Sequence, residues 1–491
     1  MRTLSMLLVL GLVACGPSSN GAGECTDAQH CDMGPCSPGA SRSCYLGQMG
    51  TEGVGPCVGG SQMCLASGTW SNCDGEVLPA PESCGDHVDN NCNGMVDEDV
   101  DQDGDGFTTC GGDCCDSTEC GNPAEVNPNA FEVPGDGVDN DCDGMVDNAV
   151  PLCDTGLQSN SSAAMDYAKA IDLCQTATMG DHKWGVIDAQ FTKADGTGTP
   201  AAELRSIRTK FGTNVTPKLG ASLMVISSGA AAAKGDTNPA FVAPENPSFD
   251  GGGTSGFPAD FLAANNGTLP NAPGCPGLNG NEANDPIMLT LKVRVPSNAR
   301  SFTIKSNFYS SEFPEYTCSP FNDFFVILLD STFNGTPANP TDKNLAFYSK
   351  NGTNYPVGVN LAYGNTGLFT ECKNGQTGCV GGTGGDIMTC MDTIDLAGTG
   401  FDDVSPEGCG TSNLIGGATG WLTTTGNVVP GEIITLRLAI WDTSDHVLDS
   451  TALIDSFEWS ADGSDPGTVI GREHPPIQLV SPTTGLAVPA E

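Results

Sequence analysis

The stretch Ile433-Ile-Thr-Leu-Arg-Leu-Ala-Ile440 decides the fold class, because its apolar residues recur at every second position, as in a half-buried β-strand. Alternating or short apolar runs of the same kind occupy residues 184–191, 221–227, 287–295, 301–308, 324–329 and 451–459. Clusters of Gly, Pro, Asn and Asp separate these runs, as turn-rich loops separate strands. One helix is expected over residues 161–174, where apolar residues recur at helical spacing. The sequence therefore predicts a mainly β chain built around a β-sandwich or jelly roll.

The length of 491 residues favours two or three domains. Changes in composition divide the chain into an export signal at 1–14, a small polar tether at 15–24, a Cys/Gly-rich disulfide segment at 25–81, Asp-rich metal-binding repeats at 82–150, the β-sandwich domain at 155–462 and a proline-rich, loose tail at 463–491. The Cys/Gly-rich segment has few large apolar residues, so disulfides would have to supply the stability that a small core cannot.

The first residues are typical of a signal peptide, with a basic Arg2, an apolar run over 4–13 and the small residue Ala14 before Cys15. The sequence Leu12-Val-Ala-Cys15 resembles a bacterial lipobox, and the resemblance implies that Cys15 is lipidated and becomes the new N-terminus. A plain secretory signal with a nearby cysteine is the alternative. We expect a lipid-anchored protein of the cell envelope, at the outer membrane or cell surface, because no later segment is long and apolar enough to span a bilayer.

The cysteines indicate disulfides. Beyond Cys15 there are 22 cysteines, 16 of them between Cys25 and Cys174 and 6 between Cys275 and Cys409. Both blocks are even in number, and export leads to an oxidising compartment, where disulfides form by default. The spacing leaves their connectivity open.

The charge is strongly negative and unevenly distributed. The formal net charge is −41, from 60 acidic and 19 basic residues, and no Lys or Arg occurs between Ser43 and Ala168. Such a balance argues against nucleic acid or anionic lipid as a partner. Carboxylates crowd the second half of the base-free interval, where they would need cations as counterions.

An internal repeat lies in this acidic interval. Residues 88–98 match residues 138–148 at an offset of fifty, with eight of eleven positions identical. In the second copy, side-chain oxygens recur at every second position before a glycine, which is how a loop supplies oxygen ligands to calcium. The candidate ligands are Asp139, Asp141, Asp143 and Asp147 in the second copy, Asp89, Asn91, Asn93 and Asp97 in the first, and Asp101, Asp103, Asp105, Asp113 and Asp116 in a third loop between them.

These loops are not standard EF-hands. An EF-hand loop has a bidentate acid at position twelve. In the loops that start at Asp89, Asp101 and Asp139, that position is Val100, Gly112 and Val150, respectively, and no helices are expected to flank the loops. We therefore expect ligands shared between loops, with disulfides as the clamp. The alternative is a cluster of Asp, Asn and Gly turns that holds no ion.

The order of motifs from about Cys84 to Asn148 resembles the MopE-like metal-binding repeat of secreted bacterial proteins. The residues that carry the resemblance are Asp101-x-Asp-x-Asp-Gly106, Asp113-Cys-Cys-Asp116, Val126-Asn-Pro-Asn-Ala130 and Asp136-Gly-Val-Asp-Asn-Asp-Cys-Asp-Gly144. The resemblance implies metal binding without fixing the metal. Oxygen-rich ligands favour calcium over copper or zinc, so calcium is the expected cofactor.

The C-terminal part resembles the choice-of-anchor L domain family over roughly residues 155–461. The resemblance lies in Phe211-Gly212 leading into residues 223–229, in 308–316 with 321–325, and in 438–445 running to 448–455, while the insertion at about 372–409 departs from the family pattern. It implies an extracellular β-rich module. At the ends of predicted strands lie Glu312, Asn322, Asp323, Asp442, Asp445 and Asp449, which we interpret as a second calcium site; solvated loop acids are the alternative.

Nothing in the sequence makes a positive case for catalysis. None of the five histidines lies in a zincin motif, and there is no Gly-x-Ser-x-Gly elbow or phosphate-binding glycine loop. We therefore predict no catalytic residues and a non-enzymatic protein: a calcium-stiffened stalk that carries a β domain for adhesion or recognition of an extracellular glycan or protein. A carbohydrate-processing enzyme and a metal-scavenging protein are the alternatives.

Overall fold

The computed structural model describes residues 36–471, except 98, 118–121, 149–150, 181, 250, 252, 279, 365, 381–386, 404–408 and 410–414. The expected signal at 1–14, Cys15 and the tether lie outside the described residues. The chain forms two compact units. The N-terminal unit contains the described residues up to Asp101 together with 108–111, and the C-terminal unit contains 102–107 and the described residues from Gly112 onward.

Disulfides hold the N-terminal unit together. Its regular structure is limited to strands β1 (Ser41–Cys44) and β2 (Gly60–Met63), which pair with each other, and the 3-10 turn η1 (Thr109–Gly111). The disulfides join Cys36 to Cys64, Cys44 to Cys73, Cys57 to Cys92 and Cys84 to Cys110. Cross-links replace the missing core, as the sequence predicts.

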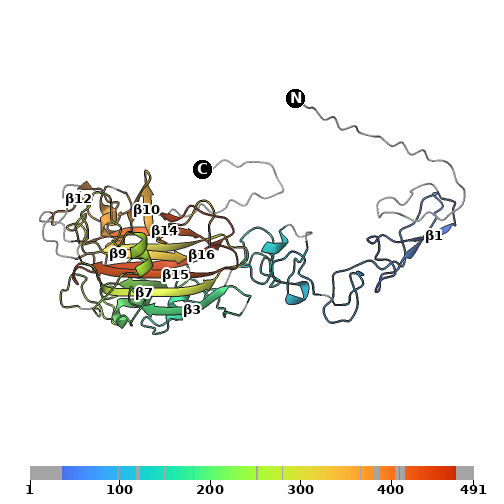
Figure 1. Cartoon of the computed structure of the whole chain (residues 1–491), viewed down its shortest axis with the longest axis horizontal. Helices are drawn as coiled ribbons and strands as arrows, with labels where there is room; N and C mark the ends of the chain where they lie inside the picture. Colours follow the sequence, from blue (N-terminus) through green and yellow to red (C-terminus); the bar gives the residue numbers. More distant parts are fainter. Residues whose placement is uncertain are drawn as a thin grey trace, which may run out of the picture. The chain divides into compact units, whose positions relative to one another are not determined.

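Two antiparallel sheets form the bulk of the C-terminal unit (Figure 1). The six-stranded sheet has the order β17 (Gly467–Ile470), β14 (Gly417–Asn427), β8 (Ser301–Ser310), β16 (Ser450–Ser460), β5 (Leu223–Ser227) and β4 (Arg205–Arg208). The five-stranded sheet has the order β3 (Gly185–Thr192), β7 (Ala283–Arg294), β15 (Ile433–Thr443) and β9 (Phe324–Asp330), with β6 (Thr254–Ser255) paired to β7.

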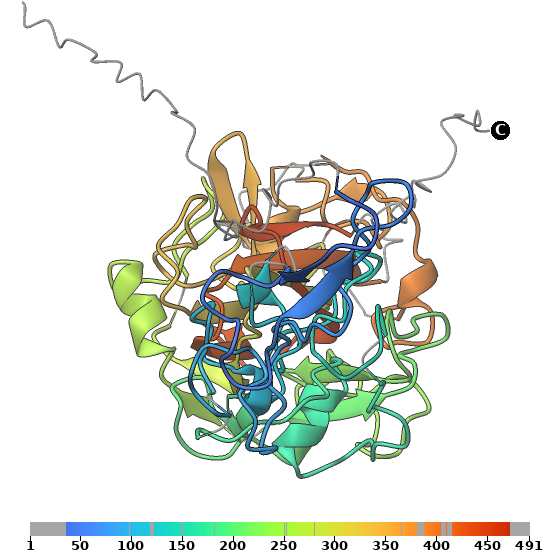
Figure 2. The same ribbon diagram turned by 90° about the vertical axis from the view of Figure 1, so that its right-hand side faces the viewer.

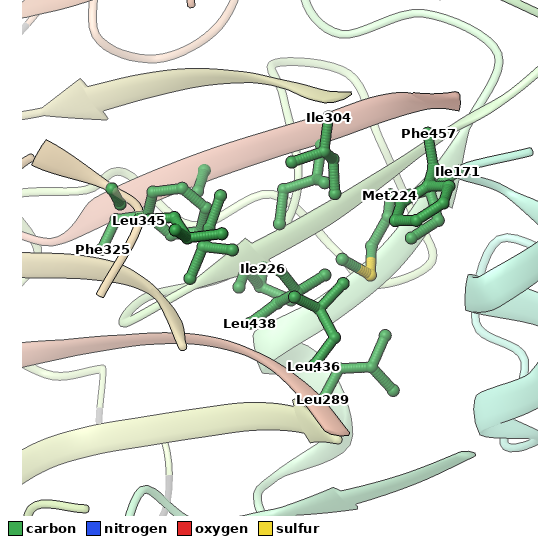
Figure 3. Close-up of a cluster of buried hydrophobic side chains, with 14 of the residues drawn as sticks. Ile171, Met224, Ile226, Leu289, Ile304, Phe325, Leu345, Leu436, Leu438 and Phe457 are labelled. Atoms are coloured by element: carbon green, nitrogen blue, oxygen red, sulfur yellow. The ribbon is translucent and has the colours of Figure 1, made fainter. Parts of the chain in front are cut away.

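The core lies between the two sheets. Strand alternation sends Leu436 and Leu438 of β15 inward beside Leu289 of β7, and Ile226 and Ile304 of the six-stranded sheet belong to the same buried cluster (Figure 3). This packing confirms the predicted mainly β fold and makes the domain a sandwich.

Each sheet is also covered on its outer face. Phe261 of helix α2 (Ala259–Ala264) packs with Met288 and Trp441 outside the five-stranded sheet, and α2 lies at the edge of the domain in Figure 2. Phe211 and Tyr309 belong to a separate cluster outside the six-stranded sheet. Burial on both faces explains why several strands read as continuous apolar runs rather than strict alternations.

The remaining elements are short. They are α1 (Ala164–Lys169), the 3-10 turns η3 (Pro123–Glu125), η4 (Ala202–Leu204), η5 (Val359–Ala362) and η6 (Ile394–Leu396), the hairpin of β10 (Phe347–Lys350) and β11 (Thr353–Pro356), and the pair β12 (Gly375–Gln376) and β13 (Ile387–Met388). Disulfides join Cys114 to Cys142, Cys153 to Cys174, Cys275 to Cys318, Cys372 to Cys390 and Cys379 to Cys409.

The structure contains all seven predicted strands and corrects three other expectations. The helix is shorter than 161–174, since it ends at Lys169 and Asp172 takes a left-handed φ of 71°. The sequence does not predict strand β14, because its glycines and threonines obscure the alternation of apolar and polar residues. The tail is not loose from Gly463 onward, because β17 pairs with β14; residues 472–491 lie outside the described part. Among the described residues, no helix is long and apolar enough to cross a bilayer.

Candidate metal sites

The second repeat folds into a tight loop around the carboxylate of Asp139. This side chain accepts hydrogen bonds from the backbone N–H groups of Asp143 (3.1 Å) and Gly144 (2.9 Å). Cys142 and Gly144 both adopt positive φ values, 57° and 90°, which turn the backbone back on itself. The disulfide of Cys142 with Cys114 fixes the loop from outside. The alternation of oxygens therefore produces a compact loop without flanking helices.

Glu132 completes this site from outside the predicted loop. One oxygen each of Glu132, Asp139 and Asp141 lies within 4.8 Å of the other two. Glu132 is buried; its Oε1 accepts the N–H groups of Asn140 (2.7 Å) and Asp141 (3.0 Å), while its Oε2 has no hydrogen-bond partner among the described residues. Burial, together with the charges of Asp143, Glu132 and Asp139, raises the pKa of Asp141. A buried, unsatisfied carboxylate oxygen beside two more acids fits a hard cation such as calcium.

Asp147 and Asp97, at position nine of the second and first repeat loops, stabilise these loops through hydrogen bonds. Asp147 accepts the N–H groups of Gly135 (2.7 Å) and Gly137 (3.3 Å). Asp97 accepts the N–H of His87 and contacts its ring Nδ1, both at 3.0 Å. Neither acid belongs to the clusters of converging carboxylates, so both side chains act in the loop scaffold.

The first repeat has the same geometry with fewer charges. Asp89 accepts the N–H groups of Asn93 (3.1 Å) and Gly94 (2.9 Å), and Glu82 accepts that of Asn91 (2.7 Å). Amides at 91 and 93 replace the carboxylates at 141 and 143. The first repeat therefore offers two carboxylates, those of Glu82 and Asp89. The second repeat offers four, those of Glu132, Asp139, Asp141 and Asp143.

Glu82 and Glu132 are the site residues that sequence reasoning missed. Both lie upstream of the compared segments, yet they obey the same offset of fifty residues, as do Asp86 and Asp136. Extending the internal comparison by six residues toward the N-terminus would have found them.

A third cluster joins Asp103, Asp105 and Asp113 in the C-terminal unit, with carboxylate oxygens within 4.8 Å of one another. Burial, partly offset by the N–H of Cys115, raises the pKa of Asp113 to about 6, with further contributions from Asp105 and Asp103. Asn127 donates its amide N–H to Asp105 at 2.6 Å.

Asp116, another predicted ligand of the third loop, also places a carboxylate oxygen within 4.8 Å of one of Asp103. Asp116 accepts the N–H of Gln102 at 2.6 Å. Asp101 is the last residue of the first segment of the N-terminal unit.

The motif Val126–Ala130 attaches this acidic region to the β domain. Asn298 accepts the N–H of Phe131 (2.9 Å) and donates to its C=O (2.8 Å), and Trp184 donates its indole N–H to Ala130 (2.9 Å). The Phe131 side chain belongs to the sandwich core. The second repeat is therefore a fixed part of the C-terminal unit.

A fourth cluster lies in the β domain and contains Glu312, Asp323 and Asp442, whose oxygens lie within 4.8 Å of one another. Burial and the charge of Asp323 raise the pKa values of Glu312 and Asp442 well above their usual range. Burial raises the pKa of Asp323 to about 7.

The other predicted residues of that region lie at its margin. The side-chain Oδ1 of Asn322 accepts the backbone N–H of Asn360 at 2.8 Å, and Asp445 accepts that of Val447 at 3.0 Å. Asp449 is buried, and its carboxylate lies so close to Gly229 that a side chain there would collide with it.

The fold and the clusters define a disulfide-stabilised β protein with oxygen-rich candidate metal sites. Residues 277–458 match the Choice-of-anchor L domain, and residues 79–98 and 121–148 match a family described as "Putative metal-binding motif". The chain thus carries a Choice-of-anchor L domain and MopE-like metal-binding repeats, which indicate an exported protein of the cell surface and a bound metal ion. Comparison with curated proteins and with solved structures found no match.

Proposed function

We propose that this is a lipid-anchored, non-enzymatic surface protein whose acidic repeats are stabilised by calcium and whose β domain serves adhesion or recognition. The main supporting observation is that carboxylate oxygens of Glu132, Asp139 and Asp141 lie within 4.8 Å of one another, and that the buried Oε2 of Glu132 has no hydrogen-bond partner among the described residues. All three ligands are hard oxygens, which calcium prefers and which suit copper and zinc less well.

The two repeats would serve different parts of the protein. The first repeat lies in the disulfide-linked N-terminal unit, between the proposed lipid at Cys15 and the β domain in chain order. The second repeat is bonded to the β domain through Asn298. Calcium would therefore stiffen the first repeat within the N-terminal unit and stabilise the second repeat against the β domain.

The insertion between Cys372 and Cys409 supports a recognition role for the β domain. Ile387, Met391 and Ile394 expose 73%, 79% and 58% of their surfaces on its described part. Large apolar side chains that remain in solvent are candidate contact points for an extracellular glycan or protein. Replacing Met391 and Ile394 with Asp should reduce attachment of cells to a surface coated with the ligand, whereas the same change at Val469 should not.

Calcium titration of the mature full-length chain, followed by scanning calorimetry with calcium and with a chelator, tests the stabilising role. We expect binding at ~10⁻⁴–10⁻³ M, the range of extracellular structural sites, and a higher melting temperature with calcium. Asp139→Asn should lose part of that gain, while Asp188→Asn, at an exposed position of β3, should keep it. Identical melting with calcium and chelator would contradict the proposal.

Two further measurements separate the alternatives. Much tighter binding than that of structural sites would favour metal scavenging, and turnover of a glycan would favour an enzyme. Cys15→Ser should release the chain from the membrane fraction if the lipid anchor exists, and unchanged fractionation would contradict it.

A further inference from the structure

The carboxylates of Glu312, Asp323 and Asp442 lie inside the sandwich. The three residues are 1%, 0% and 1% exposed, respectively. This burial differs from the solvated loop acids that strand ends usually carry. It also excludes direct capture of an extracellular ligand at this point.

All three residues continue inward-facing rows of their strands. Asp442 follows Leu438 and Ile440 at the alternating position of β15, and Asp323 precedes Phe325 and Ile327 of β9 in the same way. Glu312 comes two residues after the end of β8. The apolar interior between the sheets therefore ends in three acids, two from the five-stranded sheet and one from beside the six-stranded sheet.

These acids are only partly compensated within the described structure, where Asp323 accepts the backbone N–H of Thr443 at 3.4 Å. Both oxygens of Asp442, Oε2 of Glu312 and Oδ2 of Asp323 have no hydrogen-bond partner there. No Lys or Arg of the described residues forms an ion pair with any of the three. Three like charges held this close and out of water would be strongly destabilising without a cation or bound protons.

We propose that Glu312, Asp323 and Asp442 hold a structural calcium ion that clamps the two sheets together at one end of the sandwich. Three carboxylates supply up to six oxygens, which meets the coordination demand of calcium. The absence of His and Cys ligands from the cluster disfavours zinc and copper. Shared protons in place of the ion are the competing explanation.

Retention of the ion distinguishes this site from the repeats, whose loops are more exposed. After dialysis of the mature full-length chain against a chelator, we expect elemental analysis to find about one calcium ion per chain. Asp442→Asn should abolish this retained ion and lower the melting temperature in calcium by roughly 5–10 °C. Asp188→Asn is the control, because Asp188 is exposed on β3 and belongs to none of the carboxylate clusters, and this variant should retain the ion.

Calcium retained by the buried cluster can be distinguished from calcium bound by the repeats. Glu132→Gln changes a repeat and should leave the retained ion in place, so failure of calcium binding by the repeats would not remove this signal. If the dialysed wild-type chain holds no calcium, and Asp442→Asn melts higher than wild type in chelator, the acids share protons and the proposal is overturned. Should Asp442→Asn not fold, the wild-type metal content decides alone, and its absence overturns the proposal.

Discussion

Glu132 accepts a hydrogen bond at 3.0 Å from the backbone N–H of Asp141, and a carboxylate oxygen of each lies within 4.8 Å of the other. The Glu132 side chain thus closes the loop of the second repeat by accepting backbone hydrogen bonds, and it also adds a negative charge beside Asp139 and Asp141. These two effects can be separated by mutation, because glutamine keeps a carbonyl oxygen but loses the charge.

Glu132→Gln should preserve the fold of the loop and weaken its calcium binding by about tenfold or more, equivalent to ~1.4 kcal/mol. Titration calorimetry on the mature chain measures the affinity. Glu132→Ala should weaken calcium binding as well and also lower stability in chelator by about 1–3 kcal/mol, because two backbone donors lose their acceptor. Equal calcium affinities in wild type and Glu132→Gln would exclude Glu132 as a ligand.

Charge should set the affinity difference between the repeats. Asn91→Asp combined with Asn93→Asp gives the first repeat the carboxylates that the second has at 141 and 143. We expect calcium to bind this variant about tenfold more tightly, since affinity rises with ligand charge, and the variant to be less stable in chelator. The reverse pair, Asp141→Asn with Asp143→Asn, should weaken binding, and no change in either variant would contradict these ligand assignments.

Asn298 should be required for the attachment of the second repeat. Asn298→Ala leaves the N–H and C=O of Phe131 without their partner in a buried setting, at a cost of about 2–4 kcal/mol. Urea unfolding gives the change in stability, and hydrogen exchange at the Phe131 amide should accelerate. Asn354→Ala, on an exposed strand, is the control; similar effects of the two substitutions would argue against a specific role for Asn298.

Asp172 and Asp455 should make stability depend on pH. Burial raises the pKa of Asp172 to about 8, helped by the charges of Asp455 and Asp154, and burial raises that of Asp455 to about 6. In the folded state these two acids therefore keep protons that the unfolded chain has released, so their contribution to stability is greatest at low pH and falls as the pH rises from about 4 to about 8.

Asp172→Asn should flatten this profile and raise stability at pH 8 by ~1–2 kcal/mol, because an amide can donate to Asp455 without a charge. Thermal unfolding across that pH range, in the presence of a chelator, measures it. A profile as steep as that of wild type would show that other groups control the pH dependence.

Local pattern was sufficient to predict seven of the strands and the acidic loops, although it missed β14. The alternation in residues 433–440 fixes which side chains can share a face, and the spacing of Asp139, Asp141 and Asp143 fixes a turn that points oxygens inward. An exported chain with even blocks of cysteine predicts disulfides, but the joining of Cys57 to Cys92 depends on how distant segments meet.

The sequence by itself determined a mainly β, disulfide-linked chain with acidic loops, because periodicity, turn residues and charge act over a few neighbouring positions. Only the tertiary structure decided which acids converge. It brought Glu132 to the second repeat, turned Asn322 toward the backbone of Asn360, and buried Asp442 between two sheets. The burial of a carboxylate depends on what the rest of the chain packs around it, and no local pattern encodes that packing.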